Sequence, residues 1–93
     1  MLKVNEYFKG NVKSIALETA TGKATVGVIS PGEYEFSTST REVMTIITGK
    51  ISAKLPNSNE WKFFTPGSSF SVESGLKFKV RAESDTGYLC LYI

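Results

Sequence analysis

Histidine is absent from the 93 residues of this chain. Its absence removes the side chain that most often transfers protons near neutral pH. It also removes the commonest protein ligand of zinc, copper and non-haem iron. The sequence therefore argues against catalysis by an imidazole base and against an imidazole-ligated metal centre.

Cysteine occurs once, at Cys90, so the chain has no internal disulfide. The first ten residues carry charged and polar side chains where a signal peptide needs an apolar centre. We therefore expect a reduced, cytoplasmic setting.

Long apolar runs are also missing, because no stretch approaches the roughly 20 residues of a membrane-spanning helix. The net charge is only +2, and the lysines are scattered along the chain. Nucleic-acid-binding domains usually gather their cations into a patch or stripe. We therefore expect neither a membrane nor a nucleic acid among the partners.

The length of 93 residues corresponds to one domain, residues 1–93. A domain of this size buries only roughly 60–65% of the surface of its unfolded chain. Its core is therefore small, and packing against a second subunit would stabilise it.

Short alternating segments bounded by glycine and proline run through the chain, and no segment of ten residues has helical apolar periodicity. We expect strands near residues 12–17, 23–29, 33–37, 43–48, 51–55, 61–64, 70–72, 78–80 and 88–93. Many short strands with regular turns indicate a β-sandwich or barrel. The predicted fold class is all-β.

The segment 31–49, PGEYEFSTSTREVMTIITG, is the centre of the pattern. Pro31 and Gly32 suit a type II turn. Glu42 then leads into an apolar strand that Gly49 ends. A turn glycine, a carboxylate and a second glycine resemble the first motif of a cupin barrel, a double-stranded β-helix of jelly-roll type. Thr38 and Thr40 stand where metal-binding cupins carry two histidines.

The second cupin motif is matched by Pro66 and Gly67, with Phe70 in place of its histidine. The resemblance therefore implies a cupin without the usual metal ligands, leaving Glu42 as the one matching side chain. A metal-dependent oxygenase or isomerase of this fold is disfavoured for that reason.

A more specific resemblance covers nearly the whole chain. The segments NEYF, GNVKSIA, ATVGVISPGEYEFST, EVMTIITGK, PGSSFSV and YLCLYI occur in this order. Together they resemble the small single-domain cupins of the pyrimidine/purine nucleoside phosphorylase family. The resemblance implies reversible phosphorolysis, in which a nucleoside and phosphate give free base and ribose 1-phosphate, with broad base specificity and no cofactor.

Phosphate is itself the nucleophile in such a reaction, so no catalytic histidine is needed. Glu42 is the first catalytic candidate, because a carboxylate could bind ribose hydroxyls or stabilise the cationic sugar of the transition state. Alternatively it is an edge carboxylate paired with Arg41 or a lysine. Arg41 is the second candidate, because its planar fork binds two phosphate oxygens; otherwise it is a solvated arginine.

The remaining candidates would bind substrate. Ser37, Thr38 and Thr40 offer hydroxyl groups to an anion, although the same residues are common in loops. Tyr34 and Tyr92 offer flat surfaces for a base, or belong to the core. Met44 should share a strand face with Glu42, where it would line a pocket or merely fill one.

One apolar strand face, Leu89, Leu91 and Ile93 together with Trp61 and Phe63, suggests a contact with a second subunit. We therefore expect a homodimer. The alternative to an enzyme is a non-catalytic cupin that binds a small ligand as a sensor or carrier. The two functions would use the same pocket.

Overall fold

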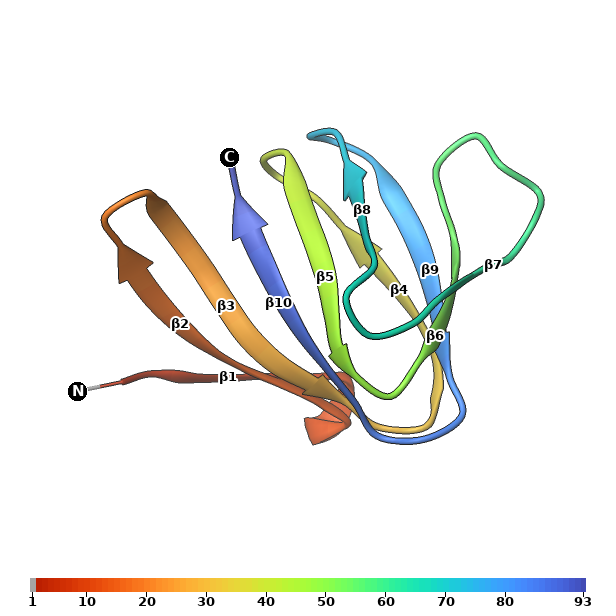
Figure 1. Cartoon of the computed structure of the whole chain (residues 1–93), viewed down its shortest axis with the longest axis horizontal. Helices are drawn as coiled ribbons and strands as arrows, with labels where there is room; N and C mark the ends of the chain where they lie inside the picture. Colours follow the sequence, from red (N-terminus) through yellow and green to blue (C-terminus); the bar gives the residue numbers. More distant parts are fainter. Residues whose placement is uncertain (1) are drawn as a thin grey trace.

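A computed structural model describes residues 2–93 and shows two antiparallel sheets facing each other (Figure 1). The strands and one short 3₁₀ turn are β1 (Val4–Tyr7), η1 (Phe8–Gly10), β2 (Val12–Thr19), β3 (Gly22–Ile29), β4 (Gly32–Ser37), β5 (Glu42–Thr48), β6 (Ile51–Lys54), β7 (Lys62–Phe64), β8 (Ser69–Val72), β9 (Lys77–Ala82) and β10 (Thr86–Tyr92). The all-β prediction is confirmed.

The strand order is β1-β2-β3-β10-β5-β8 in the larger sheet and β4-β9-β6-β7 in the smaller one. The strands thus form two separate hydrogen-bonded sheets. The C-terminal strand β10 lies between β3 and β5, so it joins the first and the middle thirds of the chain. This crossover places the inward side chains of β10 at the centre of the larger sheet.

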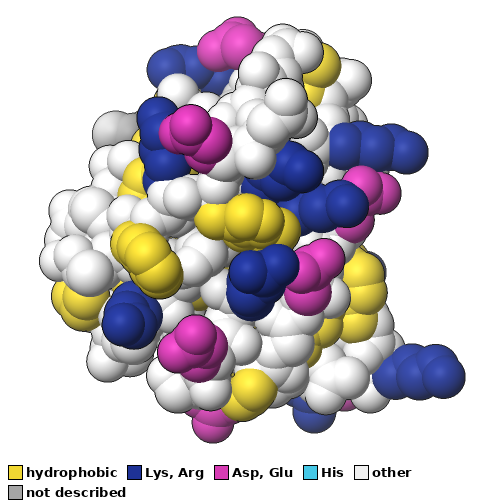
Figure 2. Space-filling view, turned by 90° about the vertical axis from the view of Figure 1, so that its right-hand side faces the viewer, with side chains coloured by type: hydrophobic (Ala, Val, Ile, Leu, Met, Phe, Trp, Pro, Cys, Tyr) yellow, Lys and Arg dark blue, Asp and Glu magenta, His cyan; other side chains and the backbone are white. Residues whose placement is uncertain are grey.

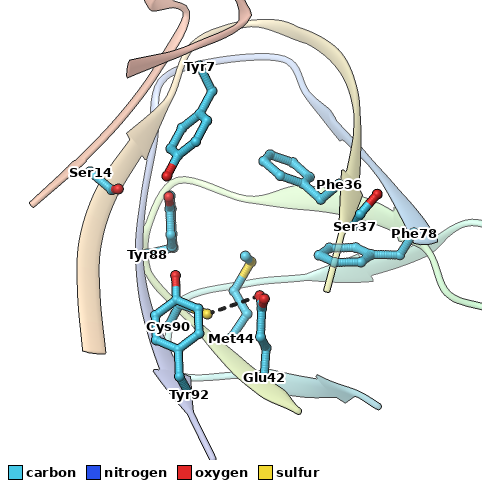
Figure 3. Close-up of a pocket in the computed structure, with 10 residues that line it drawn as sticks. All are labelled: Tyr7, Ser14, Phe36, Ser37, Glu42, Met44, Phe78, Tyr88, Cys90 and Tyr92. Atoms are coloured by element: carbon cyan, nitrogen blue, oxygen red, sulfur yellow. Dashed lines mark hydrogen bonds between the residues drawn. The ribbon is translucent and has the colours of Figure 1, made fainter. Parts of the chain in front are cut away.

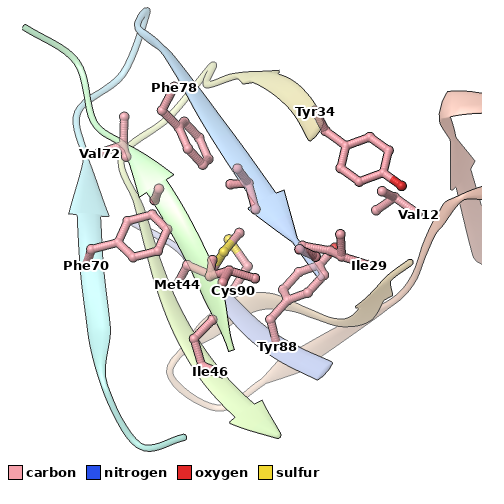
Figure 4. Packing of buried hydrophobic residues seen from close by; sticks show 14 residues of the cluster. Val12, Ile29, Tyr34, Met44, Ile46, Phe70, Val72, Phe78, Tyr88 and Cys90 are labelled. Atoms are coloured by element: carbon pink, nitrogen blue, oxygen red, sulfur yellow. The ribbon is translucent and has the colours of Figure 1, made fainter. Parts of the chain in front are cut away.

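Alternation along each strand explains which side chains are buried. In β9, Phe78, Val80 and Ala82 point inward, and the intervening Lys77, Lys79 and Arg81 are exposed. The inner faces of both sheets contribute to one core cluster (Figure 4). Its members are Val12, Ile29, Tyr34, Met44, Ile46, Ile51, Ala53, Phe70, Val72, Phe78, Val80, Ala82, Tyr88 and Cys90.

The turn between β5 and β6 shows why one glycine is needed. Gly49 has φ +82°, in the left-handed region that L side chains rarely adopt. A Cβ there would also lie 2.7 Å from Thr86 Oγ1 and 2.8 Å from the Asp85 carbonyl oxygen. This glycine allows β5 to turn closely against the start of β10.

Strand β1 and the 3₁₀ turn η1 were not expected from the sequence. Tyr7 pairs with Val12 in the ladder between β1 and β2. Phe8 and Lys9 have positive φ values of 52° and 58°, and the Phe8 ring packs 5.0 Å from that of Tyr34 between centroids. Because β1 is short, with mostly exposed residues, its alternation carried no apolar signal.

The apolar face expected at a subunit contact is divided by the topology. Leu89 and Leu91 lie on β10 in the larger sheet, whereas Phe63 lies on β7 in the smaller sheet. Arg81 lies over the Trp61 ring at 4.1 Å from its centroid. On the side of the molecule seen in Figure 2, charged side chains of both signs surround separate apolar spots. The two sets of residues therefore do not form one surface.

No helix within residues 2–93 is long and apolar enough to cross a membrane.

Candidate functional site

A cavity of about 210 Å³ lies between the inner faces of the two sheets (Figure 3). It is lined by Tyr7, Ser14, Phe36, Ser37, Glu42, Met44, Phe78, Tyr88, Cys90 and Tyr92. One wall comes from β1, β2, β5 and β10 of the larger sheet and the other from β4 and β9 of the smaller sheet. The lining combines a carboxylate, hydroxyl groups and aromatic rings, a mixture typical of sites for small polar ligands.

Glu42 is the one acidic residue in this lining. It begins β5, where it pairs with Tyr92 on one side and Val72 on the other. Burial raises the pKa of its carboxyl group above the ordinary value of 4.5, and a hydrogen bond from Cys90 opposes that shift. The Glu42 side chain therefore meets a ligand from a partly desolvated position.

The Cys90 thiol donates a hydrogen bond to Glu42 Oε1, with 3.4 Å between sulfur and oxygen. Burial, the negative charge of Glu42 and this hydrogen bond raise the pKa of Cys90 to about 12. A reactive cysteine needs a thiolate. Cys90 is therefore a neutral donor that orients Glu42, and it is not a nucleophile.

Two tyrosines of β10 carry their hydroxyl groups toward β2 and β3. The Tyr92 hydroxyl lies 3.0 Å from Thr25 Oγ1 at hydrogen-bond distance. Burial, acting against a hydrogen bond with Ser14, raises the pKa of Tyr88 to about 12. Burial also raises the pKa of Tyr92. Both phenols stay neutral at physiological pH and can donate as well as accept hydrogen bonds.

The opposite wall of the cavity is aromatic. The rings of Phe36 and Phe78 are stacked, with centroids 5.5 Å apart and an interplanar angle of 25°. Phe8 from the 3₁₀ turn meets Phe36 edge-on at 5.5 Å. A flat apolar wall facing hydroxyl groups and a carboxylate suits a ligand with one planar apolar part and one polyhydroxylated part.

Four of the residues expected at the site do line the cavity: Glu42, Met44, Tyr92 and Ser37. The Ser37 hydroxyl, however, points away from the tyrosines and Glu42 in Figure 3. It follows the exposed residues Glu33 and Glu35 along β4, so strand alternation turns its side chain outward.

Arg41 lies outside the cavity lining. Its Nε atom donates to Glu73 Oε2 at 3.2 Å, and both side chains are largely exposed. Its carbonyl oxygen accepts a hydrogen bond from the Ile93 N–H at 2.8 Å. Arg41 therefore lies next to Glu42 in the chain and bonds through its carbonyl group to the residue after Tyr92, but its guanidinium pairs with Glu73 outside the lining.

The other three expected residues make contacts elsewhere. The Tyr34 hydroxyl donates toward the carbonyl oxygens of Ser30 and Pro31, at 2.9 and 3.1 Å. Thr38 is buried, and its Oγ1 donates to the Glu73 carbonyl oxygen at 2.6 Å. Thr40 is exposed, with Oγ1 3.4 Å from the Arg41 carbonyl oxygen. None of the three lines the cavity.

Sequence reasoning did not assign six of the lining residues to the site: Tyr7, Ser14, Phe36, Phe78, Tyr88 and Cys90. Tyr88 and Cys90 share the inward face of β10 with Tyr92, so alternation from that one candidate would have found them. Tyr7 and Ser14 lack such a signal, because only the pairing of β1 with β2 and of β2 with β3 brings them to the cavity.

The donor groups at the cupin ligand positions do not fit a metal ion. The Thr38 hydroxyl is committed to backbone groups, Thr40 is exposed, and Phe70 is packed in the core. Within residues 2–93, no three or more cysteine, aspartate or glutamate side chains are grouped so that they could hold a metal. The cavity is instead built for hydrogen bonding and stacking.

Comparison with known proteins places the chain in a family. The family model described as pyrimidine/purine nucleoside phosphorylase matches residues 2–92. A relative from Pseudoalteromonas atlantica, named pyrimidine/purine nucleoside phosphorylase, is 50% identical over 93 residues, which is 100% of both chains.

Solved structures agree with the fold. A protein of unknown function from Vibrio parahaemolyticus is 36% identical, with a TM-score of 0.96 over 100% of this chain and 99% of that one. An RmlC-like cupin from Shewanella frigidimarina superposes with a TM-score of 0.75 over 99% of this chain and 83% of that one. At 16% identity this second likeness shows the cupin fold alone. The chain therefore has a cupin-type all-β fold and belongs to the pyrimidine/purine nucleoside phosphorylase family.

Proposed function

We propose that this protein catalyses the reversible phosphorolysis of purine and pyrimidine nucleosides in the cavity around Glu42. The products are the free base and ribose 1-phosphate. Membership of the family supports a nucleoside phosphorylase activity. The observation that carries the assignment to this cavity is the half-buried Glu42 carboxylate, which shares the lining with tyrosines and a stacked pair of phenylalanine rings.

In the proposed reaction the bond between C1′ of ribose and the base nitrogen breaks, and its electron pair leaves with the base. A phosphate oxygen then bonds to C1′. The base takes a proton from water, and the sugar is cationic in the transition state. Glu42 stabilises that positive charge or accepts hydrogen bonds from the ribose hydroxyls. A single well-placed group of this kind lowers the activation barrier by about 3–4 kcal/mol.

The other lining residues have matching roles. The base lies on the wall formed by Phe36 and Phe78, because stacking is tolerant of base identity and contributes about 1–3 kcal/mol per base. This tolerance would give the broad specificity. Tyr92 presents a neutral hydroxyl group to the polar part of the substrate, Tyr88 bounds the ligand space from β10, and Met44 lies beside Glu42 in the lining.

Phosphate presents a separate requirement, since the ten lining residues include neither lysine nor arginine. We assign Arg41 to this task. It precedes Glu42 in the chain, and release of its ion pair with Glu73 would free a planar fork for two phosphate oxygens. That exposed ion pair is a weak competitor, because such pairs are typically worth less than about 1 kcal/mol.

We propose that the reaction is metal-independent and cytoplasmic. The side chains at the cupin ligand positions do not suit a metal, and phosphate supplies the nucleophile. The single thiol, Cys90, is free and buried. Metal independence is tested directly by including a chelator in the assay.

We also propose a homodimer formed through the outer face of the larger sheet. Four of its apolar side chains are 39–51% exposed: Ile15, Val26, Val28 and Leu91. Exposed apolar patches on soluble proteins commonly mark interfaces. These four side chains replace the surface expected from the sequence, whose residues lie on two different sheets.

The function is tested by incubating the purified protein with uridine or adenosine, phosphate and a chelator, and measuring free base by chromatography. Glu42→Gln should lower kcat at least 100-fold. Glu35→Gln is the matched control, because Glu35 is exposed on the outer face of β4 and should leave activity unchanged.

Release of no base from any nucleoside would overturn the enzymatic proposal. Nucleoside binding without turnover would then identify a non-catalytic binding module. Equal activity of the Glu42→Gln and Glu35→Gln variants would instead refute the role of Glu42.

A further inference from the structure

Three inward residues form a row across the larger sheet beneath the cavity. Ser14 of β2 pairs with Gly27 of β3, and Gly27 pairs in turn with Tyr88 of β10. Ser14 and Tyr88 both line the cavity, and Gly27 is buried between them. The central member of the row thus has no side chain.

The Tyr88 ring occupies the space above Gly27. A Cβ atom added to Gly27 would lie 2.5 Å from the Tyr88 hydroxyl oxygen, 2.6 Å from Cζ and 2.7 Å from Cε1. Separations below 3.0 Å are not found for real Cβ atoms, so either the ring or the strand would have to move. Gly27 has no left-handed φ value. Glycine is required here by the close approach of the ring and not by the backbone conformation.

The direction in which Tyr88 leans decides where the cavity is open. Strand β10 lies between β3 and β5, and Tyr88 crosses toward β3 and Ser14. In Figure 3 its hydroxyl group points toward Ser14 and Tyr7, away from Glu42. The space between Tyr88 and the wall of Phe36 and Phe78 is therefore left free for a ligand. A methyl group on Gly27 would press the phenol back into that space.

We propose that Gly27 is a specificity-determining position, which sets the room available for the base by letting Tyr88 lie against β3. The proposal rests on the proposed nucleoside phosphorylase function. A bicyclic purine needs more room than a monocyclic pyrimidine, so the glycine matters most for purine nucleosides. Tyr88 is the residue through which Gly27 acts, and Gly27 itself touches no substrate.

The test compares kcat/KM for adenosine and uridine at saturating phosphate in four proteins: wild type, Gly27→Ala, Tyr88→Ala and the double variant. Gly27→Ala should lower kcat/KM for adenosine at least tenfold more than for uridine. In the Tyr88→Ala background the same glycine substitution should change the adenosine-to-uridine ratio less than twofold, because the displaced ring is gone. Such non-additivity is expected only when the two sites interact.

Gly87→Ala is the matched control. Gly87 is also a strand glycine without a left-handed φ value, but its added Cβ would meet Thr48 Cγ2 at 3.2 Å and not the cavity. This variant should keep the wild-type ratio. An equal ratio in wild type and Gly27→Ala would overturn the proposal, as would full additivity in the double variant.

Folding is checked by circular dichroism and thermal unfolding. Should Gly27→Ala not fold, the double variant should, since it lacks the ring that causes the overlap. If Tyr88→Ala folds and the double variant does not, the overlap lies elsewhere and the proposal fails.

If the proposed phosphorylase function is wrong, the experiment gives a different result. In that case the wild type releases no base, and calorimetric binding of adenosine and uridine to the same four proteins replaces turnover. Selective loss of adenosine binding in Gly27→Ala, absent in the Tyr88→Ala background, would still support the role of Gly27 in the cavity. Unchanged adenosine binding in Gly27→Ala would overturn it.

Discussion

The Thr38 hydroxyl joins two loops at one end of the molecule, and its removal gives a quantitative test of the structure. Thr38 is 6% exposed. Its Oγ1 donates to the Glu73 carbonyl oxygen at 2.6 Å and accepts from the Leu76 N–H at 3.1 Å. It thus ties the loop after β4 to the turn between β8 and β9. We expect this role to be structural, although the position corresponds to a cupin metal ligand.

The expected loss can be worked out for Thr38→Val, which keeps the side-chain shape and removes the hydroxyl. The Leu76 N–H loses its acceptor in a part-buried position, at a cost of about 1–3 kcal/mol. The Glu73 carbonyl oxygen loses its donor but belongs to an exposed residue, where water can replace it. A net destabilisation of about 2 kcal/mol would lower Tm by roughly 8–16 °C in a domain of this size.

Thermal unfolding followed by circular dichroism measures this loss, and Thr40→Val is the matched control. Thr40 is exposed and its Oγ1 makes only a 3.4 Å contact, so the change should stay within about 0.5 kcal/mol. Below the unfolding temperature, Thr38→Val should retain the wild-type KM for nucleoside and phosphate. A stable Thr38→Val protein with a tenfold higher KM would refute the structural role and restore Thr38 as a substrate ligand.

The titration of Glu42 and Cys90 and the outer face of the larger sheet can also be tested. Since burial raises the pKa of Glu42, the folded protein binds the carboxyl proton more tightly than the unfolded chain does. The free energy of unfolding measured in urea should therefore contain a contribution that falls as pH rises above 4.5, and Glu42→Gln should abolish that pH dependence. Because the pKa of Cys90 is about 12, a disulfide reagent at pH 8 should modify it only after denaturation, and rapid labelling of the native protein would contradict this. Sedimentation should give a dimer that Val26→Glu dissociates; a wild-type monomer of 10.2 kDa at micromolar concentration would refute it.

Part of the candidate site could be read from strand alternation. Once Glu42 is placed on an inward face, Met44 must share that face two residues later, and both do line the cavity. Tyr92 was a candidate as an aromatic residue on the strand face that it shares with Tyr88 and Cys90, and it too lines the cavity. Alternation fails at strand ends and in loops, which is why Arg41, Thr38 and Thr40 were harder to place than the residues of β5.

Position along the chain also could not show which hydroxyl groups were free to bind a ligand. The Tyr34 and Thr38 hydroxyls looked available as side chains, but carbonyl oxygens in neighbouring turns already accept their protons. Buried polar groups are nearly always satisfied in this way. The partner of Tyr34, Ser30, is close in sequence, whereas the partner of Thr38, Glu73, is distant. In both cases the hydrogen bond leaves the hydroxyl proton unavailable to a ligand.

Composition, period-two alternation and the order of the motifs were enough to establish the all-β fold, the family and the absence of imidazole chemistry, because they are read along the chain without reference to strand pairing. The cavity could be found only in the folded molecule. The insertion of β10 between β3 and β5 brings Tyr88 over Gly27 and Cys90 beside Glu42, residues more than forty positions apart. The physical reason is that pairing between distant strands sets which inward side chains meet, and alternation alone carries no information about the neighbouring strand.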